Sequence, residues 1–261
     1  MARRTFFGTL RLALLVALLL FVALGAWLDR RRSTDWDGTL RVTVYPLAAV
    51  AQESVLEYVS GLDDSAYDAV ESFVAREAAS HGVSLDQPVR IRISRGADGL
   101  PPAAPEDPGP LSVAFWSLRM RYWAWRVAMD DPLPTPDIQV FALYHPADDA
   151  TVSLDSVGLS KGLMAVTHLF AADVAGEGNA VVLTHELLHT LGASDKYDPA
   201  TGVPVAPDGL GDPSQDPLYP QRSGEIMAGR IALSADEAII PESLEQMTVG
   251  AVTAREIGWS K

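Results

Sequence analysis

The chain contains no cysteine and little histidine. None of its 261 residues is a cysteine, and five are histidines. The missing cysteines exclude disulfides, cysteine-based zinc sites and thiol nucleophiles. Only His185 and His189 lie close together in the sequence, whereas His81, His145 and His168 are scattered and are expected to have structural or surface roles. The sequence therefore favours His185 and His189 as the histidines that take part in chemistry.

Positive charge is scarce beyond the N-terminus. The chain has a formal net charge of −14, but residues 1–34 hold six arginines and one acid, which leaves −19 for residues 35–261. A domain this acidic is repelled by nucleic-acid phosphates and by an extended anionic surface. We therefore expect no nucleic-acid partner. The charge is compatible with cationic substrates, although a generally acidic composition explains it equally well.

One long uncharged run, Leu12 to Leu28, lies near the N-terminus. At about 1.5 Å per residue it is near the lower limit for crossing a hydrocarbon core of roughly 30 Å, and it is longer than a signal-peptide core of about 7 to 15 residues. Residues 1–34 are therefore predicted to be a membrane anchor or an uncleaved signal segment. The small residues Ala23 and Gly25 leave cleavage open as an alternative. Arginines on both sides leave the orientation open.

Strands and helices alternate through the first part of the remaining chain. Several segments alternate apolar and polar residues, as half-buried strands do. Between the first two lies a predicted helix with Ser65 as its N-cap and Gly82 as its stop. This order predicts a domain of the α+β or α/β class, with strand, helix and strand as the entry to an α/β domain. The predicted strands are residues 39–47, 88–94, 137–144 and 162–170.

An aromatic-rich helix is predicted from Leu111 to Met129. Its apolar residues recur at helical spacing, and Arg119, Arg121 and Arg126 sit among them. Trp116, Met120, Trp123 and Val127 widen the apolar band, and a helix that packs against the core is the favoured interpretation. The alternative is a surface helix that rests on a membrane or borders a cleft, because Trp and Arg suit an interface. The stripe consists of Leu111, Phe115, Leu118, Tyr122, Trp125 and Met129.

The densest chemical signal is the run from His185 to Tyr197. It opens with H-E-x-x-H, which on a helix places His185 and His189 one turn apart on the same face. Two such imidazoles suit a zinc ion, and Glu186 between them is the candidate general base for a metal-bound water. The alternative is a buried helix whose histidines only satisfy hydrogen bonds.

A catalytic zinc site usually has three protein ligands, so the two histidines need a third. Gly192 accepts a left-handed backbone and readily ends a helix, which would let the chain turn beneath the metal. Asp195 is then the predicted third ligand. A glutamate ligand such as Glu225 is an alternative, but it would leave Gly192 and Asp195 without a role.

The chain after Asp195 is poor in periodic patterns. Residues 198–224 are rich in Pro, Gly and Asp and are predicted to be a long loop. Their carboxylates are compatible with Ca²⁺ binding, but they lack regular ligand spacing, and solvated loop acids are the favoured interpretation. Met227 follows this loop, and a C-terminal helix is predicted for Ser243–Trp259.

The pattern H-E-x-x-H-x-x-G-x-x-D, followed by Met227, resembles the metzincin clan of zinc peptidases, in the snapalysin-like variant with aspartate as third ligand. The resemblance covers a small part of the chain. It implies a metzincin-like zincin domain over residues 35–261, with a twisted mixed sheet, an active-site helix and a C-terminal helix after a methionine turn. It also implies an N-terminal subdomain to about residue 192 and a C-terminal subdomain from about residue 193.

One position departs from the clan. Gly229 stands where some metzincins carry a tyrosine that can approach the metal or the oxyanion. Any oxyanion donor must therefore come from elsewhere. Tyr197 is considered for this role, with anchoring of the turn after Asp195 as the equally supported alternative.

The expected function is that of a zinc-dependent endopeptidase. His185, His189 and Asp195 would hold Zn²⁺, and Glu186 would take a proton from the metal-activated water. Gly192 and Met227 would support the site. The expected partners are a protein or peptide substrate and, through the N-terminal segment, a membrane. The domain is expected to be extracytoplasmic, or secreted if that segment is cleaved.

Two alternatives belong to other functional classes. The first is a catalytically silent, membrane-anchored metzincin-like binding module, in which Glu186 would have little use. The second is a zinc hydrolase that acts on a non-protein amide, such as a cell-wall peptide. The motifs indicate the chemistry of a metal and a water, and they do not identify the acyl group that is attacked.

Overall fold

The computed structural model describes residues 34–147 except 106 and 108, together with residues 157–159 and 163–260. Within these ranges no helix is long and apolar enough to span a membrane. The uncharged run Leu12–Leu28, on which the anchor prediction depends, lies outside the described residues.

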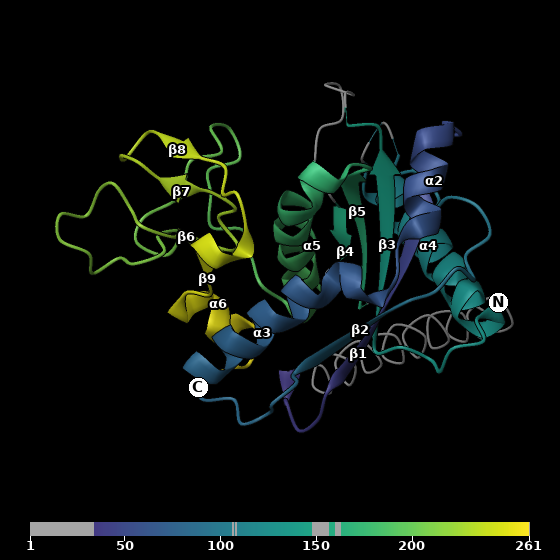
Figure 1. Cartoon of the computed structure of the whole chain (residues 1–261), viewed down its shortest axis with the longest axis horizontal. Helices are drawn as coiled ribbons and strands as arrows, with labels where there is room; N and C mark the ends of the chain where they lie inside the picture. Colours follow the sequence, from purple (N-terminus) through teal and green to yellow (C-terminus); the bar gives the residue numbers. More distant parts are fainter. Residues whose placement is uncertain (1–33, 106, 108, 148–156, 160–162, 261) are drawn as a thin grey trace, which may run out of the picture.

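A five-stranded sheet forms the centre of the domain, in the order β2-β1-β3-β5-β4 (Figure 1). The first four strands pair in parallel, and β4 pairs antiparallel to β5 at one edge. The α/β class and the mixed sheet are therefore confirmed. The strands are β1 (Leu40–Ala48), β2 (Val89–Ile93), β3 (Ile138–His145), β4 (Val157–Leu159) and β5 (Met164–Phe170).

Helices cover both faces of the sheet (Figure 1). The larger core cluster joins α2 (Glu53–Gly61), α3 (Asp68–Ser80) and α5 (Gly176–Leu191) to sheet residues such as Val44. The next residue of β1, Tyr45, belongs to a second cluster, because successive side chains of a strand point to opposite faces. That second cluster contains the buried residues of α4 (Pro110–Asp130). The helix α4 therefore covers the sheet face opposite α5.

The start of α3 differs from the sequence prediction. Ser65 does not cap it: the side chain of Asp63 accepts a hydrogen bond from the backbone N–H of Ser65 and begins a 3-10 helix, η1 (Asp64–Tyr67). The α-helix follows from Asp68. Asp63 takes the N-cap position because its carboxylate is a stronger hydrogen-bond acceptor than a serine hydroxyl. Gly82 ends the segment as predicted, with a φ of 88°.

The helix α4 packs on the sheet as favoured and lies within one residue of its predicted bounds at each end, but it does not pack through its stripe. All six residues of the stripe are exposed, from 56% for Trp125 to 86% for Leu111. The helix instead buries Met120, Ala124 and Val127 on its other side.

The chain beyond α5 forms a loop-rich region beside that helix (Figure 1). The predicted C-terminal helix Ser243–Trp259 is too long. Residues 247–248 instead form β9 (Met247–Thr248), which pairs with β6 (Gly224–Glu225), and α6 spans Ala251–Glu256. The remaining elements are β7 (Ile231–Ala232), β8 (Ala238–Ile239) and the 3-10 helices η2 (Asp173–Ala175) and η3 (Leu244–Gln246).

Residues from both sides of Gly192 share one hydrophobic core. Phe73 of α3, Leu187 of α5 and Met247 of β9 belong to the same buried cluster. The division into subdomains at about residue 192 stays a prediction. The shared core holds the end of α5 between the sheet and the loop-rich region.

Candidate metal centre

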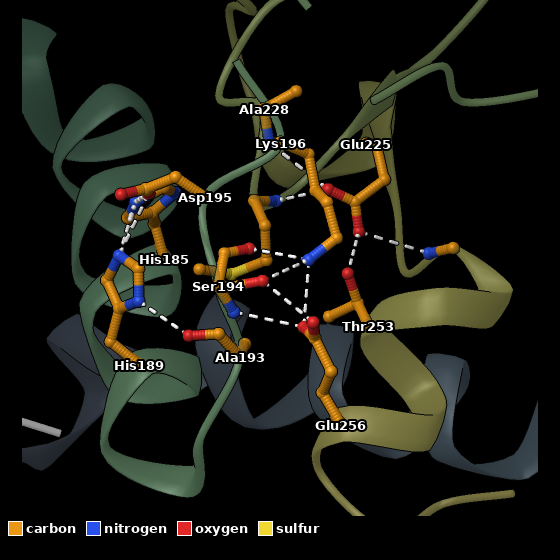
Figure 2. A network of polar contacts seen from close by, with 12 residues as sticks. His185, His189, Ala193, Ser194, Asp195, Lys196, Glu225, Ala228, Thr253 and Glu256 are labelled. Carbon is orange, nitrogen blue, oxygen red and sulfur yellow. Dashed lines mark hydrogen bonds and ion pairs between the residues drawn. The ribbon is translucent and has the colours of Figure 1, made fainter. Parts of the chain in front are cut away.

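The helix α5 and the turn after it bring His185, His189 and Asp195 together (Figure 2). The Nε2 atoms of the two histidines lie 3.0 Å apart. The Oδ1 atom of Asp195 lies 3.2 Å from the Nε2 atom of His185 and 3.1 Å from the Nε2 atom of His189. Within the described part of the chain, this is the one group of three or more such side chains that could hold a metal ion. The three predicted ligands are thus neighbours in space.

Gly192 makes the turn between the last histidine and Asp195. Its φ of 106° is left-handed, and it follows the last helical residue, Leu191. The N–H groups of Gly192 and Ala193 donate to the carbonyls of His189 and Leu188, which closes the helix end. A residue with a Cβ is strained at this φ, and the predicted left-handed helix end at Gly192 is confirmed.

Hydrogen bonds orient both imidazoles. The Nδ1 atom of His185 lies 2.9 Å from the carbonyl oxygen of Ile226, and that of His189 lies 2.9 Å from the carbonyl oxygen of Ala193. A carbonyl can only accept, so each Nδ1 carries a proton and donates it. In the neutral rings the lone pair is then on Nε2. Both lone pairs are directed at the same point, as in metal sites with fixed ligand tautomers.

This donor set fits a zinc ion. Bonds of about 2.0–2.2 Å at tetrahedral angles separate ligand atoms by roughly 3.3 Å. The three separations found here, between 3.0 and 3.2 Å, are close to that value. Two lone pairs and a carboxylate oxygen at such distances repel one another unless a cation or a proton lies between them. Two nitrogen ligands and one oxygen ligand are also a set that zinc accepts.

The protonation of the cluster reflects the same attraction for positive charge. Burial opposes ionisation of Asp195, but hydrogen bonds from His185 and His189 lower its pKa far below its ordinary value. Burial likewise would lower the pKa of His189, yet the hydrogen bonds to Asp195 and Ala193 and the charge of Glu186 raise it. The cluster therefore favours positive charge near the point where the two imidazoles and the carboxylate converge.

Glu186 lies beside the cluster without belonging to it. It follows His185 on α5, its side chain is buried, and its charge acts on His189. A carboxylate at this place is within electrostatic reach of the metal position and is not one of the three converging donors. The arrangement suits proton transfer more than ligation.

The segment around Met227 contacts the cluster through its backbone. The carbonyl of Ile226 orients His185, and the carbonyl of Met227 accepts a hydrogen bond from the backbone N–H of Lys196. The side chain of Met227 is fully buried in the main core. The backbone of Met227 is thus joined to the residue next to Asp195, while its supporting role stays a prediction.

Glu225 has a structural role. Its carboxylate accepts hydrogen bonds from the N–H groups of Met227, Ala228 and Gly250 and from the Thr253 hydroxyl, at 2.6 to 3.2 Å. Burial raises its pKa, and these donors act in the opposite direction. Glu225 is outside the metal cluster. The alternative with Glu225 as the third ligand therefore has no geometric basis.

Tyr197 and the loop acids are less informative. The ring of Tyr197 lies 6.4 Å from that of His185, and its backbone forms a bridge with Pro204. The bridge fits the role of anchoring the turn, while an oxyanion role stays a prediction. Asp198 and Asp212 accept hydrogen bonds from nearby backbone N–H groups in turns. Calcium binding also stays a prediction.

Sequence reasoning missed the contacts that hold the two neighbours of Asp195 in the chain. Figure 2 shows Ser194 and Lys196, its two neighbours, directed at Glu256 of α6. The Lys196 Nζ donates to Glu256 at 2.8 Å and to the Ser194 carbonyl at 2.7 Å, and the Ser194 N–H and hydroxyl donate to the same carboxylate. Lys196 is 7% exposed. No sequence pattern connects Lys196 to Glu256, 60 residues later. The one available signal was that a lysine follows the predicted ligand Asp195 directly and would need an acidic partner.

We expect Glu256→Gln to weaken zinc binding by about 10- to 100-fold, the usual effect of changing a residue that supports a ligand. Glutamine keeps the shape but loses the charge that holds Lys196 and with it the backbone on both sides of Asp195. Zinc affinity is measured by competition with a chelating dye. Glu245→Gln, on the exposed surface of η3, is the matched control. Equal affinity in both variants would contradict the positioning role.

Comparisons with known proteins give no further identification. No protein-family profile matches this chain, and a search of curated proteins finds no significant match.

Proposed function

We propose that this protein is a zinc-dependent endopeptidase with a metzincin-like catalytic domain. One observation carries the proposal: His185, His189 and Asp195 converge through atoms 3.0 to 3.2 Å apart, with Glu186 buried beside them. A binding site for metal alone would not need a carboxylate at that position. The combination is the one that hydrolysis by an activated water requires.

The residues have separate tasks in this proposal. His185, His189 and Asp195 hold the metal through Nε2, Nε2 and Oδ1. When bound, zinc supplies a Lewis acid that lowers the pKa of a water and polarises a carbonyl. Glu186 accepts the proton of the attacking water and passes it to the leaving amine. Ile226 and Ala193 keep the two imidazoles in the tautomer that ligation needs.

The arrangement of elements supports the finer assignment. A mixed sheet precedes α5, and β4 is its antiparallel edge next to β5. An edge strand has free backbone N–H and C=O groups, which can pair with an extended peptide. We therefore assign β4 to the substrate side. The segment containing Met227 and the helix α6 follow in the order that the metzincin resemblance implies.

The N-terminal segment places the domain at a membrane in this proposal. The run Leu12–Leu28 is uncharged and long enough for a short span. The catalytic domain is proposed to lie outside the cytoplasm, since a peptidase inside would threaten the proteins of its own cell. Cleavage of the segment would make the same domain a secreted enzyme.

Zinc content and bond cleavage together test the function. We expect one zinc per full-length chain by elemental analysis, and cleavage of internal bonds in a mixed peptide library by mass spectrometry. Removal of zinc with a chelator should abolish cleavage, and added zinc should restore it. Zinc binding without cleavage of peptides or cell-wall fragments would contradict the enzyme in favour of a binding module. Cleavage of cell-wall fragments alone would contradict the peptidase in favour of the non-protein hydrolase.

A further inference from the structure

The outward face of α4 is apolar over its whole length. Seven of the fifteen exposed large hydrophobic side chains found in the described residues belong to this one helix. Six of them form the stripe from Leu111 to Met129, which at about 100° per residue falls within an arc of roughly 80°. The stripe is roughly 27 Å long. Single exposed hydrophobic residues need no explanation, but a continuous stripe of this kind marks a binding surface.

The two borders of the stripe carry arginines. Arg119 and Arg126 lie on one side of it and Arg121 on the other, by helical position. Asp130 is the one acid within α4, and it pairs with Arg126 at its exposed end. The helix thus carries a net positive charge in a chain whose net charge is −14. The surface therefore suits a partner that offers apolar groups in the middle and negative groups at the sides.

We infer that this face of α4 rests in the headgroup region of a phospholipid bilayer. Tyr122 and Trp125 have the amphipathic rings that settle at this depth, and Leu118 and Phe115 would enter the acyl region. The arginines would reach lipid phosphates while their stems cover apolar surface. Although the domain as a whole is acidic, this helix is the part whose charge and apolar groups agree with a lipid surface.

The length of chain before the described residues supports the same partner. The uncharged run ends at Leu28, and the first described residue is Thr34. Six residues span at most about 20 Å. A bilayer that contains the run therefore holds the domain close to its surface. The inference rests on this anchoring, which is part of the proposed function, and not on the zinc chemistry.

Two other occupants fit the helix less well. In a second copy of α4, paired in either direction, the bordering arginines of the two helices would face one another and repel. The run Leu12–Leu28 of the chain itself offers apolar groups but no negative charge. A phospholipid surface satisfies the stripe and both of its borders.

The absence of cysteine allows a direct test in the full-length chain. Leu118→Cys is labelled with an environment-sensitive fluorophore, and the chain is reconstituted in phosphatidylcholine vesicles with and without phosphatidylglycerol. Brominated acyl chains should quench this label several-fold more than a label at Leu56→Cys, and aqueous iodide should quench it less. Leu56 is an exposed residue of α2, on the opposite side of the sheet. Arg119→Gln with Arg126→Gln should reduce the bromine quenching by at least half.

Each other outcome overturns the inference. Iodide quenching of the Leu118→Cys label means that the stripe faces water, and protection from both quenchers means that protein covers it. Flotation with the vesicles separates these results from failed anchoring, because a chain that does not float has lost the premise itself. Trp125→Phe in the unlabelled chain gives an independent reading: bromine quenching of tryptophan fluorescence should fall, and unchanged quenching contradicts the contact.

Discussion

Replacing Glu186 by glutamine is expected to lower kcat for peptide cleavage by about 100- to 10,000-fold, the usual contribution of a general base. Glutamine has nearly the same shape but cannot accept the proton of the attacking water. The three ligand atoms come from other residues, so zinc should remain bound at one ion per chain. The measurement is steady-state cleavage of the best peptide found in the library, together with elemental analysis of the same sample.

The control for this variant is on the same helix. Glu177→Gln changes an exposed glutamate in the first turn of α5 and should leave kcat unchanged. A Glu186→Gln protein that keeps its zinc and cleaves at the original rate would remove Glu186 from the mechanism. Loss of zinc in that variant would instead show that Glu186 belongs to the metal site.

Asp195→Ala is expected to weaken zinc binding by more than about 100-fold, because even changes to residues that only orient a ligand cost 10- to 100-fold. The substitution removes one of three converging donors and leaves only the two Nε2 atoms, 3.0 Å apart, to hold the ion. Zinc affinity is measured with a competing chelator, and the melting temperature of the apoprotein shows whether the variant is folded.

A neighbouring aspartate provides the comparison. Asp198 is exposed and accepts a hydrogen bond from the backbone N–H of Ala200, so Asp198→Ala should bind zinc like the original protein. If Asp195→Ala also binds zinc with undiminished affinity and stoichiometry, the assignment of the third ligand is wrong. Cleavage should be lost in parallel with the metal.

The metal cluster was accessible from the sequence because its geometry is local. A helix fixes the relation of His185 to His189, and a left-handed glycine fixes the direction in which the chain leaves it. Asp195 then lies within reach of both rings, as the structure confirms by the short distances among the three residues. The α/β class followed for a similar reason, from alternating segments interrupted by a helix.

Features that depend on distant contacts were not accessible. The spacing of α4 shows that one side is apolar, but it does not tell which of two apolar sides packs on the sheet; Met120 and Ala124 do, and Leu118 does not. The supposed long C-terminal helix contains Met247 and Thr248, which pair with β6 instead. Glu256 and Lys196 are separated by 60 residues, and their contact is a product of the folded chain.

The contact between Lys196 and Glu256 also sets an order of events during synthesis. All three candidate ligands have been made once Asp195 has, but the carboxylate that holds both its neighbours is made 60 residues after Lys196. The carbonyl that orients His185 also comes later, at Ile226. A nascent chain therefore contains the three candidate metal-binding residues long before the contacts that hold them in place can form. Tight binding at the proposed metal site is therefore expected only late in synthesis, when most of the domain can already fold around it.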